Sequence, residues 1–87
     1  MFEVRLKITG LKKDIEKTIV DTSGIRAINS LYSWLRWDCK DVIGEVFAKN
    51  LPANFITMTA RQKARAMCQA IDDNDYTHTT ISFRKID

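Results

Sequence analysis

The feature that most constrains this chain is a long row of apolar residues spaced three and four positions apart. Its members are Ile25, Ile28, Tyr32, Leu35, Cys39, Val42 and Val46. Alternating intervals of three and four place side chains on one face of an α-helix. The row therefore predicts a helix with one buried face through the middle of the 87-residue chain.

Residues at either end of the row suggest where this helix begins and ends. Ser23 or Gly24 starts it, because the preceding side-chain oxygens can accept hydrogen bonds from its first free amides. Residues 50–54, which include Pro52, form the clearest loop. An uninterrupted helix has about 25 residues and a length of about 37 Å. A break at Trp37 and Asp38 into two helices is the alternative, and we prefer one helix because the apolar row keeps its phase there.

Alternating polarity predicts three strands. The first is the clearest, because Phe2, Val4, Leu6 and Ile8 alternate with Glu3, Arg5, Lys7 and Thr9. A second strand is expected from Ile15 to Asp21, with Ile15 and Ile19 inward, although a short helix over residues 11–17 fits nearly as well. Residues 77–86, rich in Thr and in β-branched or aromatic side chains, predict the last strand.

A shorter helix completes the expected elements. Ala60, Ala64, Met67 and Ile71 share a face at helical spacing, Thr57 or Thr59 caps the start, and the acidic run 72–75 ends it. The order is β-β-α-α-β. We therefore expect an α+β fold in which one long and one shorter helix pack on one face of a small three-stranded antiparallel sheet. The last strand is expected to pair with the first.

Composition limits the class of protein. The chain is short enough to form a single domain over residues 1–87, and its charge of +3 permits nucleic acid as a partner without requiring it. No apolar run is long enough for a membrane span or a signal core, so a cytoplasmic protein that does not bind a membrane is expected. Cys39 and Cys68 are expected to be two buried free thiols.

The outward face of the sheet offers one candidate surface. Its cations are Arg5, Lys7 and Arg84, with Lys12, Lys13 and Lys17 on or near the hairpin between the first two strands. Such a surface could follow a phosphate backbone. The more ordinary interpretation is a solvated face, because the aromatic residues on which sheet-based RNA-binding proteins stack bases are missing from these positions.

A second candidate surface lies off the main apolar face of the long helix. Trp37, with Arg36 beside it, stands among small residues, as expected of an anchor for a partner protein. The alternative is that the shorter helix covers Trp37. Arg61, Lys63 and Arg65 form a positive cluster near the start of the shorter helix, which either contacts a partner or is simply its solvated side.

Residues that could support catalysis or metal binding are few. His78, Asp73, Asp75, Cys39 and Cys68 are the only collection from which such a site could be built, and their spacing does not fit zinc or calcium motifs. The serines show no partnered His and acid in the sequence, and the glycines are isolated. We therefore expect no enzyme, no metal and no cofactor.

The resulting hypothesis is a small, non-enzymatic protein-binding module. It would modulate or inhibit a macromolecular partner by occupying its surface, as one-domain phage and mobile-element inhibitors do, which it resembles in size and style only. The alternative is a nucleic-acid-binding protein that uses the basic sheet face and the cluster from Arg61 to Arg65. A homodimer is a third hypothesis, because three-and-four spacing also suits the pairing of two identical helices.

Overall fold

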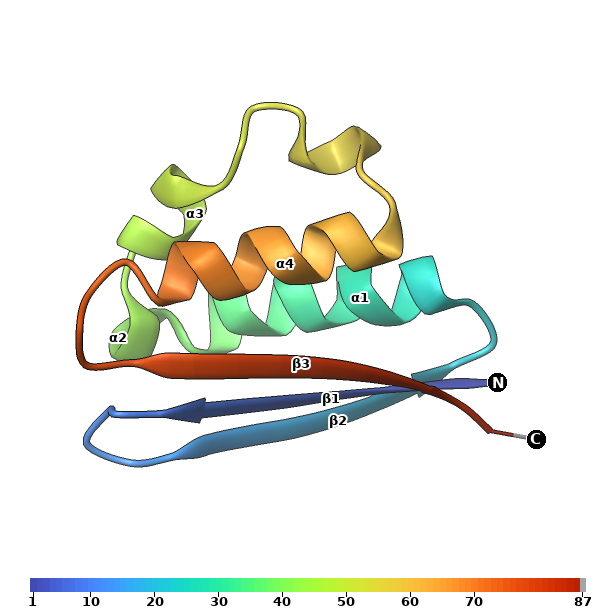
Figure 1. Ribbon diagram of the computed structural model, residues 1–87, viewed down its shortest axis with the longest axis horizontal. Coiled ribbons are helices and arrows are strands. Elements are labelled where there is room, and N and C mark those ends of the chain that lie inside the picture. Colours follow the sequence, from blue (N-terminus) through green and yellow to red (C-terminus); the bar gives the residue numbers. More distant parts are fainter. Residues whose placement is uncertain (87) are drawn as a thin grey trace.

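The computed structural model describes residues 1–86 and shows an α+β fold with all its helices on one side of a three-stranded sheet (Figure 1). The strands are β1 (Phe2–Thr9), β2 (Ile15–Asp21) and β3 (His78–Lys85). They are antiparallel in the order β2-β1-β3, so β1 is central and pairs with both neighbours. The predicted sheet, and the pairing of the last strand with the first, are confirmed.

The two faces of the sheet follow the alternation in the sequence. Val4, Leu6 and Ile8 of β1 are fully or almost fully buried beneath the helices. Ile19 lies opposite Val4, and Ile15 lies opposite Ile8, so these two side chains of β2 share that face, whereas Val20 is 45% exposed on the other face. The other face of the sheet is open, because no helix formed by residues 1–86 covers it (Figure 1).

Two helices form the layer on the sheet. α1 (Gly24–Ser33) contacts β1 and β2, and α4 (Ala60–Ile71) contacts β3 and α1. The Ser23 side chain accepts a hydrogen bond from the Arg26 amide at the start of α1, as predicted. Thr59 caps α4 through a reciprocal pair of hydrogen bonds with Gln62. Both helix starts therefore follow from local sequence.

The prediction of a single long helix is wrong. After α1 the chain widens into a π-helical turn, η1 (Trp34–Asp38), followed by the short helices α2 (Lys40–Ile43) and α3 (Val46–Asn50). Gly44 causes the sharpest change of direction, with φ 78° and ψ −179°, a conformation almost restricted to glycine. The break near Asp38, given above as the alternative, is closer to the structure. The layering of helices on the sheet survives because α1 and α4 carry it.

The interruption moves the apolar row out of phase with the core. Ile28, Leu35 and Cys39 are buried, but Val42 and Val46 are 53% and 55% exposed. Phe47 turns inward instead and is 1% exposed, with its ring centroid 6.0 Å from that of Tyr32. Phe55 of the 3₁₀ turn η2 (Phe55–Thr57) packs on the other side of Tyr32, at 5.2 Å. Residues 40–57 thus add an outer aromatic cluster to the core.

Two further expectations concern cysteines and membranes. Both thiols are free, but only Cys39 is buried and Cys68 is half-buried, so the expectation of two buried thiols is right for one of them. Within residues 1–86, no helix has the length and apolar character needed to cross a bilayer.

Candidate functional site

Trp37 is the largest side chain that the fold leaves exposed, with 64% of its surface accessible. It lies in the π-helical turn η1, where the widened turn follows the end of α1. Of the two interpretations drawn from the sequence, the structure contradicts the one in which the shorter helix covers Trp37. Burial of Trp37 in the core is therefore excluded.

Arg36 is held beside Trp37 by two aromatic rings. Its guanidinium carbon lies 4.9 Å from the centroid of the Trp37 ring and 5.9 Å from that of Tyr32. The same guanidinium donates a hydrogen bond to the Tyr32 hydroxyl. Cation–π contacts of this kind restrict a long and otherwise mobile side chain. Arg36 is therefore positioned before any partner arrives.

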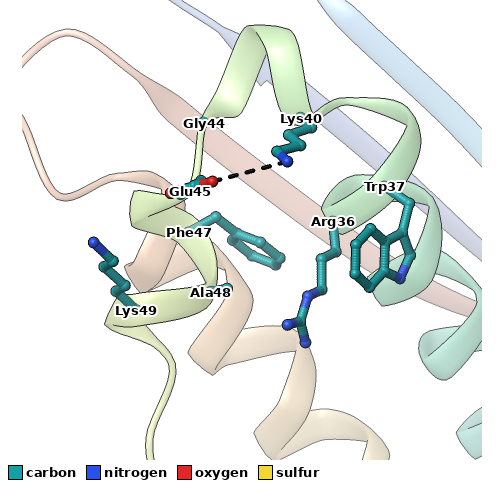
Figure 2. A pocket seen from close by; sticks show the side chains of 8 residues that line it. All are labelled: Arg36, Trp37, Lys40, Gly44, Glu45, Phe47, Ala48 and Lys49. Carbon is teal, nitrogen blue, oxygen red and sulfur yellow. Dashed lines mark ion pairs between the residues drawn. The ribbon is translucent and has the colours of Figure 1, made fainter.

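These two residues form one wall of a groove, called here the Trp37 groove. It has a volume of about 370 Å³ and is lined by Arg36, Trp37, Lys40, Gly44, Glu45, Phe47, Ala48 and Lys49. Figure 2 shows the ring of Phe47 pointing toward Arg36, and Lys49 directed away from it on the far side. Three of the lining side chains are cationic and one is anionic, so the groove has an apolar floor and a positive rim.

The groove depends on the turn at Gly44. That turn lets α3 fold back, so that Phe47 reaches Tyr32 and the wall from α3 faces the wall from η1. An ion pair between Lys40 Nζ and Glu45 Oε1, 3.8 Å apart, spans the same turn (Figure 2). The sequence analysis missed Phe47 as a groove residue and Tyr32 as the ring on which it packs. Gly44, inside an otherwise helical pattern, was the available signal.

Trp37 also borders a second hollow on its other side. This hollow has a volume of about 480 Å³ and is lined by Asn29, Ser30, Ser33, Trp34, Trp37 and Asp38. Trp34 itself is half-buried against the core, and Lys17 Nζ lies 5.2 Å from its ring centroid. Trp37 therefore lies between two hollows: the Trp37 groove, which is apolar with a positive rim, and this second hollow, which is lined mainly by polar residues.

The predicted cluster on the shorter helix is only partly correct. Arg61 and Arg65 are exposed and line another groove, beside β3, which has no residue in common with the Trp37 groove. Lys63 is 5% exposed, and its Nζ donates to Asn29 Oδ1 at 2.8 Å and lies 5.4 Å from the Phe55 ring centroid. Lys63 points elsewhere because residues two apart on a helix lie about 200° apart.

Ion pairs neutralise much of the open sheet face. Arg5 Nε lies 2.8 Å from Glu3 Oε1, and Arg84 Nη2 lies 3.5 Å from the same oxygen. Lys7 Nζ lies 3.7 Å from Glu16 Oε1. Glu3 and Glu16 thus pair with all three cations that the sequence placed on this face, and their two negative charges offset two of the three positive ones. The face carries much less positive charge than a list of its cations suggests.

The remaining cations of that surface are divided between two places. Lys12 and Lys13 are exposed in the turn between β1 and β2. Lys17 lies opposite Leu6, on the helix-covered side of the sheet, where it contacts Trp34. Lys17, which we expected near the hairpin as part of this surface, therefore does not belong to it. Ile15 and Ile19, both inward, already indicated this, since residues two apart on a strand share a face.

The residues considered for metal binding or catalysis lie apart from the Trp37 groove. Within residues 1–86, no three His, Cys, Asp or Glu side chains come together in a group that could hold a metal ion. Asp73 Oδ2 accepts a hydrogen bond from Asn50 Nδ2 at 3.1 Å, and His78 and Asp75 are exposed.

Both thiols are held in their neutral form. Burial, and then the charge of Asp72, raise the pKa of Cys68 to about 11, while an interaction with the backbone of Ile81 lowers it. Burial and Asp38 likewise raise the pKa of Cys39, against an opposing effect of Lys17. Because the thiolate is the nucleophilic form, neither cysteine is activated.

Comparison of the chain with protein-family models, curated proteins and solved structures found no match.

Proposed function

We propose that this chain is a non-enzymatic protein-binding module whose contact is centred on Trp37 and Arg36. The observation that carries the proposal is the exposed indole of Trp37, stacked against an immobilised arginine at the rim of an apolar groove. Tryptophan, tyrosine and arginine are the residues most enriched among those that dominate binding energy at protein interfaces. Tyr32, Arg36 and Trp37 bring one of each together.

The groove indicates the chemistry of the partner surface. Phe47 and Ala48 offer an apolar floor that suits an aliphatic or aromatic side chain. Arg36 Nη1 already donates to Tyr32, and the other guanidinium N–H groups can meet a carboxylate from the partner. An apolar anchor flanked by acidic residues fits both features. Binding of this kind would modulate the partner by occupying its surface, in the manner proposed from the sequence.

The test compares two exposed aromatic residues. Trp37→Ala removes the proposed anchor, whereas Tyr76→Ala removes a side chain that is 82% exposed and lies outside the groove. Wild type and both variants serve as bait against extract of the source cell, with mass spectrometry of the captured proteins. Titration against the purified partner should show that Trp37→Ala weakens binding by at least about 30-fold, the equivalent of 2 kcal/mol. Tyr76→Ala should bind like wild type.

Thermal unfolding is the control for this experiment. Because Trp37 is exposed, its replacement should change the free energy of unfolding by no more than about 0.5 kcal/mol. Equal capture by wild type and Trp37→Ala would refute the proposal. A loss of capture that accompanies a large fall in stability would assign the effect to folding instead.

Nucleic acid is the second candidate partner, and the open sheet face is where it would bind. A hollow of about 430 Å³ there brings Arg5 and Lys7 together with the hydroxyls of Thr18, Thr80 and Ser82. The ion pairs with Glu3 and Glu16 weigh against it. Anisotropy titrations with single- and double-stranded DNA and RNA at about 50 and 200 mM salt separate the candidates, because phosphate binding falls steeply with salt. Tight, salt-sensitive binding would favour nucleic acid.

A further inference from the structure

The outer edge of β3 is a surface separate from the Trp37 groove. β3 pairs with β1 along one side only, because the sheet order places it at an edge. The Ile86 amide donates to the Met1 carbonyl at 2.8 Å, which shows that the backbone groups of Ile86 face β1. In an antiparallel pair, alternate residues direct both backbone groups to the same side. Ile81, Phe83 and Lys85 therefore direct theirs away from β1.

Side-chain contacts close the first part of this edge, and its end is open. The Thr79 amide, which shares this phase, donates to Asp72 Oδ2 at 2.8 Å, and the Thr79 hydroxyl donates to Asp72 Oδ1 at 2.7 Å. No strand of the described chain lies beside Phe83 or Lys85. Outward N–H and C=O groups in a row are a template for another strand. The Ile81 backbone already interacts with the Cys68 thiol, so the open groups are those of Phe83 and Lys85, enough to pair with a short segment.

A groove runs between this edge and α4, and we call it the β3 edge groove. It has a volume of about 510 Å³. Ala64 and Cys68 of α4 and Ile81 and Phe83 of β3 form an apolar floor, while Arg61 and Arg65 are exposed at the α4 side. These α4 residues fall at intervals of three and four, so one helix stripe faces the edge. A segment added to β3 would place alternate side chains in this groove.

We propose that an extended, acidic segment of a partner protein binds here as a fourth strand on β3. The positive charge around the groove favours an acidic segment. Arg61 and Arg65 line the groove, Lys85 is exposed at the end of β3, and the groove lining formed by residues 1–86 contains no acidic residue, whereas Arg84 is already paired with Glu3 on the other face of the sheet. Backbone hydrogen bonds supply affinity, and these cations supply the preference for Asp and Glu.

Two other occupants fit the surface less well. A second copy of the chain, paired through the same edge, would bring two cationic edges together, with no acidic residue in the described groove lining to offset their charge. A nucleic acid strand could neutralise the cations, but it has no backbone pattern of alternating donors and acceptors to match that of β3. The acidic peptide segment satisfies the charge, the backbone groups and the apolar floor together.

A model peptide tests the proposal directly. The probe is a fluorescein-labelled ten-residue peptide of alternating Glu and Val, measured by anisotropy in about 150 mM salt. We expect a dissociation constant below about 1 mM, and binding at least about tenfold weaker for the same peptide with Lys in place of Glu. An acidic peptide with every backbone amide N-methylated should also bind at least about tenfold more weakly, because it keeps its charge but donates no hydrogen bond.

Variants of the protein locate the binding site. Arg61→Glu with Arg65→Glu should weaken binding of the acidic peptide at least about tenfold. Lys12→Glu with Lys13→Glu makes the same change of net charge in the turn between β1 and β2, and should change binding less than about twofold, because salt screens distant charges. The Trp37→Ala variant should bind the peptide like wild type, which separates this proposal from the proposed function.

Hydrogen exchange gives the readout that depends on strand pairing. Peptide binding should protect the amides of Phe83 and Lys85, which face outward, while those of Ser82 and Arg84, already paired with β1, change little. The proposal fails if the acidic peptide does not bind, if the N-methylated peptide binds equally well, or if Phe83 gains no protection. A β3-paired dimer of the chain in sedimentation experiments would also overturn it.

Discussion

Phe47 is expected to hold the whole segment from Lys40 to Asn54 against the rest of the protein. It is the only fully buried residue in that segment, and its ring packs on Tyr32. α2 and α3 have four and five residues, too few to be stable as isolated helices. Replacement of Phe47 by Ala should therefore release the segment and dismantle the Trp37 groove.

The expected cost of Phe47→Ala is about 3 kcal/mol. Truncation of a buried phenylalanine typically costs about 3–5 kcal/mol. The lower end applies here because Phe47 is the one fully buried side chain of the segment, so the segment can loosen instead of leaving a rigid cavity. At an m-value of about 1.5 kcal/mol/M, a loss of this size lowers the urea midpoint by about 2 M.

Amide hydrogen exchange identifies where the stability is lost. The amides of Val42, Ile43, Gly44 and Lys49 donate hydrogen bonds to carbonyls of Cys39, Lys40 and Glu45, so their exchange should accelerate strongly in Phe47→Ala. Amides of β1 should still exchange only through global unfolding.

Two controls make the result refutable. Phe47→Leu keeps an apolar side chain and should cost about 1 kcal/mol. Val46→Ala alters the neighbouring residue, which is 55% exposed, and should cost no more than about 0.5 kcal/mol. The reasoning fails if Phe47→Ala costs less than about 1 kcal/mol, or if Val46→Ala costs as much.

Two further predictions concern a tight turn and a half-buried thiol. Gly10→Ala should lower the free energy of unfolding by about 2–4 kcal/mol in urea titrations, because φ is +92° and the new Cβ would lie 1.9 Å from the Tyr76 carbonyl oxygen. Lys12→Ala, in the same connection, should change it by no more than about 0.5 kcal/mol, and a tolerated Gly10→Ala would contradict the described approach of the two loops. Cys68, whose pKa is raised from 9.0 to about 11, stays protonated in the fold while the unfolded chain ionises, so stability should fall between pH 9 and pH 11. Urea midpoints over that range should fall less in Cys68→Ala, and identical pH profiles would show that the thiol is not shielded.

The strands and helix starts could be predicted because local rules decide them. Alternation in β1 determined which residues are buried, and side-chain oxygens at Ser23 and Thr59 determined where α1 and α4 begin. Two errors about single residues were also avoidable from the same rules. Strand periodicity already placed Lys17 inward, and helical periodicity already separated Lys63 from its neighbouring arginines.

The course of the chain after α1 could not be predicted from spacing alone. The apolar row continues through Val42 and Val46, yet the structure buries Phe47 in their place. Gly44 permits the turn, but a glycine also permits a continuous helix at a cost of about 1 kcal/mol. The choice is made by contacts of Phe47 and Phe55 with Tyr32, residues that are distant in the sequence.

By itself, the sequence determined the α+β class, the antiparallel sheet and the inward faces of its strands, because periodicity and capping act over a few residues. Tertiary structure alone decided that Trp37 is exposed, that Arg36 is fixed beside it, and that Arg61 and Arg65 flank an open strand edge. Exposure depends on which distant segments arrive to cover a side chain. The proposed binding surfaces are therefore properties of the folded arrangement rather than of any local motif.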